Sequence, residues 1–463
     1  MNRADADRCG ARALRSSIGK PVFALCLGLF AGVVQAQAEV VMPGKARELS
    51  SVAERIFRAD QPLLLQVRTL LKSTQKQASI GSGFIVDARG LAITNYHVVS
   101  QYALEPETYQ LEYAAADGTS GALRLYAIDV VNDLAVVRLE APPDARFKAF
   151  EFDAAAVAGK LTKGERMFSM GNPLDLGFGI VEGTYNGLVE KSYQAQVHFT
   201  GALNPGMSGG PVVTPKNRIA GINVAKRVSG DLVSFLVPAE AAYRLLEQAK
   251  KREEMDASAT RKEIVAQVLR WRDGFFSALK TEGFREAVFG SYRAPESRAA
   301  WFDCWSETND NERPKPKTRI NGSSCDTDIV IYLDDNVHIG SAKIAHTHLK
   351  NVDLNALQFA RKTSDYYKNR RSFWRDGRTA YDCREDFLSG AAEAKRPVLR
   401  LTWCARAYRE FPGLYDFMLA AVTQDRPDEA LVSNLAMAGV SFEHAIAMSR
   451  DFLTLLKADH DLD

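Results

Sequence analysis

The feature of this sequence that most constrains its fold is a long succession of short strand-like segments between residues 63 and 237. The segments are rich in aliphatic residues and are separated by turn residues, as at 87–90, which joins 79–86 to 91–94. Further strands are expected at 109–114, 123–129, 135–139, 166–170, 193–200, 210–214, 219–224 and 233–236. Many short strands without alternating helices are typical of a β-sandwich or a β-barrel.

The periodicity changes after Pro238. Apolar residues recur at helical spacing over 239–250 and a charged run follows, which predicts a domain boundary near residue 250. Beyond it we expect an amphipathic helix at 261–279 and a hairpin in which residues 334–336 separate 328–333 from 337–349. Three helical segments are expected to close the chain, with Gly439 as a C-cap and Ser441 as an N-cap. The second half is therefore predicted to be an α+β domain.

The first 38 residues have the layout of a signal peptide. Five basic residues precede an apolar stretch, 21–34, which ends at Ala36-Gln37-Ala38. The stretch is shorter than the about 20 residues that a membrane-spanning helix needs, and no second candidate follows. We therefore expect a mature chain that is periplasmic or secreted, soluble and without stable membrane insertion.

Length and charge bound the remaining possibilities. At roughly 150 residues per domain, 463 residues predict two or three units, here a signal peptide at 1–38, one domain at 39–250 and another at 251–463. The whole chain has a formal net charge of +2, and removal of five basic and two acidic residues with the signal leaves −1. A nearly neutral chain has no overall electrostatic footprint for nucleic acid, so no nucleic-acid partner is expected.

Four cysteines remain after the signal peptide: Cys304, Cys325, Cys383 and Cys404. Four cysteines allow three pairings. In an exported protein they favour disulfides over a metal site, because no close pair has the spacing of zinc ligands. Local spacing alone favours Cys304 with Cys325 and Cys383 with Cys404.

A glycine-flanked serine suggests a nucleophile. Peptide hydrolysis at neutral pH needs a nucleophile, a base, a carboxylate that orients the base, and donors for the oxyanion. Ser208 lies in the segment NPGMSGGP, where glycines permit a tight turn that aims backbone N–H groups at one point. We expect the turn of Gly206, Met207 and Ser208 to form the oxyanion hole, with the N–H groups of Gly206 and Ser208 as donors.

Two further segments supply the base and the acid. His97 follows the predicted hairpin over 81–94, and histidine is the side chain suited to exchanging protons near pH 7. Asp133 stands at the head of an apolar strand, where its carboxylate can be buried beside the imidazole. His97, Asp133 and Ser208 are therefore the predicted catalytic residues.

These three motifs and their order resemble the HtrA/DegP group of trypsin-like serine proteases, over about residues 63 to 245. Gly171-Asn172-Pro173 and Gly221-Ile222-Asn223 are similar to loops that line the active site in that group. The resemblance implies a double β-barrel with the triad between the barrels and no cofactor. It also implies an exported serine endopeptidase that cleaves unfolded or damaged polypeptides, and it suggests a homotrimer. The alternative is a protein that keeps the triad but acts mainly as a chaperone or adaptor.

The sequence departs from the group at several positions. Met207 replaces a residue that is usually polar, Gly201 stands where an acid is common, and no PDZ domain is recognisable after residue 250. In trypsin-like folds the residue six before the nucleophile forms the floor of the primary pocket, and here it is Ala202. With Asn204 and Asn223, Ala202 is expected to form a substrate pocket that accepts small or medium apolar side chains.

Histidines in the second half raise the question of a metal. His346 and His348 alternate along one expected strand and so share a face, with His338 nearby. No cysteine or carboxylate completes a ligand set at recognisable spacing, so we expect a solvated sheet face and no metal site.

Overall fold

The computed structural model describes residues 51–224, 233–327, 329–334, 336–368, 377–390 and 395–458. The expected signal peptide lies outside the described residues.

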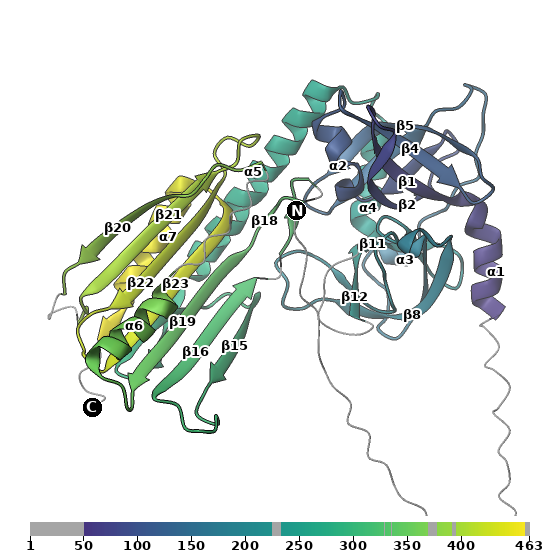
Figure 1. Ribbon diagram of the computed structural model, residues 1–463. Helices are drawn as coiled ribbons and strands as arrows, with labels where there is room; N and C mark the ends of the chain where they lie inside the picture. The colour runs from purple at the N-terminus through teal and green to yellow at the C-terminus, as the bar shows by residue number, and fades with distance from the viewer. Residues whose placement is uncertain are drawn as a thin grey trace, which may run out of the picture. The chain divides into compact units, whose positions relative to one another are not determined.

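The first strands close into a barrel with the order β1-β2-β3-β6-β5-β4 (Figure 1). The members are β1 (Leu64–Leu71), β2 (Lys76–Ile85), β3 (Leu91–Thr94), β4 (Tyr109–Ala115), β5 (Ser120–Asp129) and β6 (Leu134–Leu139). Strand β6, with the sequence LAVVRL, is buried along almost its whole length, as expected for a wall covered on both sides. Closure removes the exposed edges that so many short strands would otherwise present.

A second barrel follows, with the order β10-β11-β12-β9-β8-β7. Its strands are β7 (Arg166–Gly171), β8 (Gly179–Leu188), β9 (Val197–Thr200), β10 (Pro211–Val213), β11 (Ile219–Val224) and β12 (Val233–Pro238). The predicted double barrel is thus confirmed. Strand β8 was not predicted, because its glycines interrupt the apolar alternation. One of them, Gly183, is required by close packing, since a Cβ there would lie 2.3 Å from the carbonyl oxygen of Thr200.

Short helices lie between and beside the barrel strands. They are α1 (Ser51–Asp60), α2 (Tyr96–Leu104), α3 (Ala154–Val157) and α4 (Ala239–Ala249), with 3₁₀ turns at Gln61–Leu63 and Pro173–Asp175. Helix α4 was expected from its spacing, whereas α2 was not. The latter follows strand β3 after a single residue, Asn95, and its apolar side chains Val98, Val99 and Ala103 pack into the core of the first barrel.

The C-terminal region, residues 257–458, combines helices with sheets (Figure 1). Its helices are α5 (Ala257–Glu282), α6 (Ala356–Tyr367) and α7 (Phe442–Thr454). The large sheet has the order β15-β16-β19-β23-β22-β21-β20, with all neighbours antiparallel. Its strands are Phe302–Thr308, Thr318–Thr327, Ala342–Asn351, Glu429–Val440, Tyr415–Thr423, Leu399–Ala407 and Asp382–Leu388, in that order. The predicted α+β class is confirmed.

Smaller sheets complete this region. Strands β13 (Phe284–Phe289), β14 (Tyr292–Ser297) and β24 (Lys457–Ala458) form one of them. Of the expected hairpin, only β17 (Ile331–Tyr332) and β18 (His338–Ile339) pair with each other, whereas most of the expected second arm is β19 of the large sheet.

Part of the C-terminal prediction was wrong. Within the described residues the chain closes with two helices, α6 and α7, rather than the three expected. The segments between them include strands β21 to β23, and Gly439 lies inside β23 instead of capping a helix. These strands are rich in alanine, leucine and methionine, which favour helices when isolated, but cross-strand pairing overrides that preference. Ser441 is the N-cap of α7, as predicted, and its side chain accepts a hydrogen bond from the backbone of His444 at 3.1 Å.

Helices cover both faces of the large sheet. Leu349 of β19 packs with Phe359 of α6, whereas Ile344 of the same strand belongs to the apolar cluster that contains Phe452 of α7. An odd and an even position of one strand point to opposite faces, so α6 and α7 lie on opposite sides. The cluster on the α7 side also includes Val268 of α5 and continues into the first barrel.

The disulfides lie at both edges of the large sheet. Cys304 is bonded to Cys325 and Cys383 to Cys404, the pairing that local spacing favoured. In each case the two residues are direct cross-strand partners, joining edge strand β15 to β16 and edge strand β20 to β21. Edge strands have unpaired backbone groups on one side, so each bridge ties down a strand that would otherwise fray.

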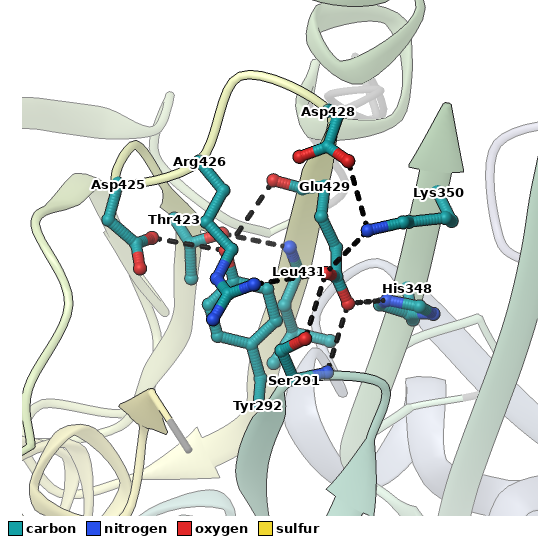
Figure 2. A network of polar contacts seen from close by, with 10 residues as sticks. All are labelled: Ser291, Tyr292, His348, Lys350, Thr423, Asp425, Arg426, Asp428, Glu429 and Leu431. Carbon is teal, nitrogen blue, oxygen red and sulfur yellow. Dashed lines mark hydrogen bonds and ion pairs between the residues drawn. The ribbon is translucent and has the colours of Figure 1, made fainter. Parts of the chain in front are cut away.

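The expected solvated histidine face was wrong, because His346 and His348 are 1% and 5% exposed. His346 lies 2.9 Å from the hydroxyl of Ser433 and 2.8 Å from the carbonyl oxygen of Pro295. His348 lies 2.6 Å from Glu429, which is itself buried (Figure 2). Both rings are thus used in internal polar contacts.

Glu429 is the centre of that network (Figure 2). It accepts hydrogen bonds from the backbone and the hydroxyl of Ser291, both at 2.9 Å, and its carboxylate lies 3.2 Å from the ammonium of Lys350. Burial alone would raise the pKa of Glu429, but the hydrogen bonds from His348, Ser291 and Lys350 hold this pKa well below its usual range. A buried carboxylate is therefore kept charged by its donors.

Candidate active site

The barrel topology brings His97 and Asp133 together. Strands β3 and β6 pair with Thr94 opposite Ala135, so the residues that follow β3 and precede β6 meet at one end. His97 Nδ1 lies 2.7 Å from Asp133 Oδ2, and the backbone N–H of His97 donates to Asp133 Oδ1 at 2.8 Å. The His97 and Asp133 side chains are 13% and 10% exposed, so the pair is shielded but still reachable from solvent.

Asp133 adopts an uncommon backbone conformation. Its φ angle is 56°, in the left-handed region that aspartate tolerates better than most residues. The side-chain amide of the buried Asn95 donates to the carbonyl oxygen of Asp133 at 2.7 Å. Asn95 stands two residues before His97, so one short segment holds both the backbone and the carboxylate of Asp133.

Ser208 follows a sharp turn just before β10. Gly206 has a φ of +92°, and a Cβ at this position would lie 2.4 Å from the carbonyl oxygen of Asn172. Both facts require glycine here. The N–H of Met207 donates to the carbonyl oxygen of Asn204 at 3.0 Å, and the Met207 side chain is buried, so the turn itself uses Met207.

Ser82 connects the two barrels beneath this turn. Its hydroxyl donates to the carbonyl oxygen of Gly206 at 2.7 Å and accepts from the N–H of Asn172 at 2.9 Å. Its backbone N–H donates to the carbonyl oxygen of Ser208 at 2.7 Å. Ser82 lies in the predicted hairpin over 81–94, but no role was predicted for its hydroxyl; its position between two glycines is the only sequence signal for one.

Comparison with known proteins gives a family for this part of the chain. The family model described as "Trypsin-like peptidase domain" matches residues 81–222. This part of the chain is a trypsin-like peptidase domain. The two barrels together with helices α1 to α4 are called the peptidase domain.

The peptidase domain is similar in sequence to HtrA and Deg proteins, as the motifs predicted. Protease Do-like 1, chloroplastic, of Arabidopsis thaliana is 27% identical over 258 residues, which cover 50% of this chain and 56% of that protein. Serine protease HTRA3 of Homo sapiens is 30% identical over 217 residues, covering 45% and 46%. A probable periplasmic serine endoprotease DegP-like of Brucella suis biovar 1 is 29% identical over 185 residues, covering 38% and 34%. The chain therefore spans about a third to a little over half of these relatives' own lengths.

The predicted pocket residues of the peptidase domain lie in different environments. Ala202 is half-buried and Asn204 is exposed, both on the segment before Ser208. The hydroxyl of Ser234 in β12 donates to the carbonyl oxygen of Gly201 at 2.7 Å and so holds this segment against the second barrel.

Asn223 has no exposed surface in this structure. Its side-chain oxygen accepts from the Ser169 hydroxyl at 2.8 Å, and its side-chain NH₂ donates to the carbonyl oxygens of Met170 and Met207 at 2.9 and 3.2 Å. Asn223 therefore supports the turn before Ser208, and any effect of Asn223 on a substrate would act through that turn.

Within the described ranges, no group of three or more His, Cys, Asp or Glu side chains could hold a metal ion. The same part of the chain contains no helix that is both long and apolar enough to span a membrane.

Proposed function

We propose that this chain is an exported serine endopeptidase with Ser208 as nucleophile, His97 as general base and Asp133 as the orienting acid. The observation that carries the proposal is the double link between His97 and Asp133, through the ring at 2.7 Å and the backbone at 2.8 Å. An ionised carboxylate only accepts hydrogen bonds, so the proton of His97 sits on Nδ1 and leaves Nε2 to act as the base. The relatives named above as serine proteases support the same chemistry.

The reaction follows from these roles. Ser208 Oγ attacks the scissile carbonyl carbon while His97 Nε2 takes the hydroxyl proton, and Asp133 stabilises the resulting imidazolium. The N–H groups of Gly206 and Ser208 are the proposed donors to the oxyanion. Collapse of the tetrahedral intermediate breaks the C–N bond, and His97 gives its proton to the leaving amine. A water molecule, deprotonated by His97, then attacks the acyl-enzyme carbonyl; the ester C–O bond breaks, and His97 returns the proton to Ser208 Oγ.

The proposed substrates are polypeptides, unfolded or damaged ones in particular. Ala202 at the floor of the primary pocket favours small or medium apolar side chains before the scissile bond, since it has no charge to pair with Lys or Arg. The N-terminal sequence pattern and the name of the Brucella relative support a periplasmic location.

The test compares wild type, Ser208→Ala and the control Ser306→Ala, which removes an exposed hydroxyl of β15. Cleavage of casein and labelling by a fluorophosphonate are measured together. Ser208→Ala should lose at least about 10⁴-fold in cleavage and all labelling, with an unchanged circular dichroism spectrum. Undiminished cleavage by this variant would exclude the mechanism. A wild type that cleaves nothing but suppresses aggregation would favour the chaperone alternative.

A further inference from the structure

Helix α5 of the C-terminal region contacts the segment that leads to Asp133. The Gln267 side-chain oxygen accepts from the N–H of Val130 at 2.8 Å, and its NH₂ group donates to the carbonyl oxygen of Ile128 at 2.9 Å. The same NH₂ group donates to Glu263 of α5 at 2.8 Å, which fixes its orientation. One side chain thus satisfies two backbone groups just before the predicted catalytic aspartate.

Strand β17 of the C-terminal region contacts His97 itself. The ring centroids of Tyr332 and His97 are 4.9 Å apart with an interplanar angle of 38°. Next to this contact, the hydroxyl of Tyr96 donates to the carbonyl oxygen of Leu333 at 2.9 Å. Burial raises the pKa of Tyr96 well above its usual value, so the hydroxyl stays protonated as a donor. Tyr332 of β17 and the next residue, Leu333, therefore contact His97 and Tyr96, two consecutive residues of α2.

The packing around these contacts is close. The cavity between β17 and the peptidase domain has a volume of about 30 Å³ and is bordered by Tyr332, Val330, Asp133 and residues 194–196, which leaves room for one or two water molecules. Beside it, the ring of Tyr193 packs edge-on against Phe275 of α5, with centroids 5.0 Å apart. Segments flanking both His97 and Asp133 are thus in contact with the C-terminal region.

We infer that Gln267 and Tyr332 are positioning residues for the catalytic pair, and that the active site is complete only when the C-terminal region is seated on the peptidase domain. The inference rests on the proposed function of His97, Asp133 and Ser208. Its physical basis is that a proton-transfer pair must be held closely in place, since a displacement of about 1 Å can cost about 100-fold in rate. Tyr332 limits the tilt of the imidazole, and Gln267 fixes the backbone that carries Asp133.

The experiment uses the full chain with four substitutions. Tyr332→Ala removes the ring, Tyr332→Phe keeps it, and Gln267→Ala removes both hydrogen bonds to residues 128 and 130. Tyr366→Ala on α6 is the matched control, because Tyr366 is 39% exposed and belongs to the same region. Thermal unfolding and circular dichroism establish that each variant is folded before kinetics are compared.

Tyr332→Ala and Gln267→Ala should each lower kcat on the order of 10- to 100-fold, with KM changed much less. Tyr332→Phe and Tyr366→Ala should remain close to wild type. If Tyr332→Ala and Gln267→Ala both match the Tyr366→Ala control while wild type cleaves, the inference is overturned and the proposed function stands.

A second readout does not depend on proteolysis. In Ser208→Ala protein labelled at histidine, the His97 ring resonances, assigned by comparison with His97→Asn, should shift when Tyr332→Ala removes the neighbouring aromatic ring. They should stay in place in Tyr366→Ala. Unchanged His97 resonances in Tyr332→Ala would overturn the inference even if wild type proved to have no protease activity. Failure of the inference can therefore be distinguished from failure of the proposed function.

Discussion

Asp133 holds His97 at two points, because one carboxylate oxygen accepts from the His97 backbone at 2.8 Å while the other lies 2.7 Å from the ring Nδ1. Asp133→Asn should keep the left-handed backbone, which asparagine also tolerates, but should favour the wrong histidine tautomer. We expect kcat to fall by about 10⁴-fold at neutral pH with little change in thermal stability. Steady-state kinetics check this against Asp117→Asn, an exposed turn control, and a loss below tenfold would contradict it.

Ser82 should matter for catalysis without touching the substrate. Ser82→Ala leaves the carbonyl oxygen of Gly206 and the N–H of Asn172 without their hydroxyl partner. Each buried polar group left unpaired costs about 1–3 kcal/mol, so the nucleophile turn should loosen. The measurement is kcat, together with the rate of fluorophosphonate labelling of Ser208, and both should fall more than in Ser79→Ala on the same strand. Equal rates in the two variants would show that the hydrogen bonds of the Ser82 hydroxyl are dispensable for catalysis.

Ala202 predicts the cleavage preference. Wild type should cut after Val, Ala or Leu, and Ala202→Asp should create a preference for Lys and Arg by placing a carboxylate at the pocket floor. A peptide library analysed by mass spectrometry gives both profiles. Basic residues dominating the wild-type profile would disprove the assignment of Ala202.

The disulfides should protect the edges of the large sheet more than its centre. Each closes a separation of 21 residues, which corresponds to about 3 kcal/mol on the loop-entropy model. Reduction should therefore speed amide exchange in β15 and β20 first, while β19 and β23 keep their protection. Hydrogen exchange with and without reductant tests this order. Mass mapping of exported protein that finds four free thiols would contradict the presence of the disulfides on which the prediction depends.

His346 should make the C-terminal region sensitive to acid. Burial lowers the pKa of His346 to about 4, whereas an unfolded histidine titrates near 6.5. Between pH 4 and pH 6.5 the unfolded state therefore binds more protons than the folded state. The free energy of unfolding that is present above pH 6.5 decreases as the pH falls toward 4. From pH 7 to pH 5 the expected loss is about 2 kcal/mol from this one group.

Urea unfolding at both pH values measures that loss, with His346→Gln as the comparison. The variant cannot titrate at this position, so its unfolding free energy should change less between pH 7 and pH 5 than that of wild type. A wild type and a variant with the same pH dependence would remove His346 as the cause.

The sequence was sufficient for much of the peptidase domain. Strands such as β3 and β6 combine apolar residues with nearby turns, which are local signals, and their succession predicted a β-sandwich or a β-barrel. The double barrel was implied by the resemblance to the HtrA/DegP group. His97, Asp133 and Ser208 were predicted because each lies in a short recognisable motif. The cysteine pairing also followed from spacing, since cross-strand neighbours in a hairpin are close in sequence.

Only the tertiary structure decided which residues hold the site together. Ser82 meets Gly206 across 124 positions, and the hydroxyl of Tyr96 meets Leu333 across 237. Gly439 was expected to cap a helix, and alanine and leucine in β22 and β23 do favour helix locally. Pairing of these strands with each other and with β19 overrides that preference. Local sequence patterns indicate which side chains are chemically able to react. A hydrogen bond or a ring contact between distant segments depends on how the barrels and sheets pack. That packing cannot be predicted from any short stretch of sequence.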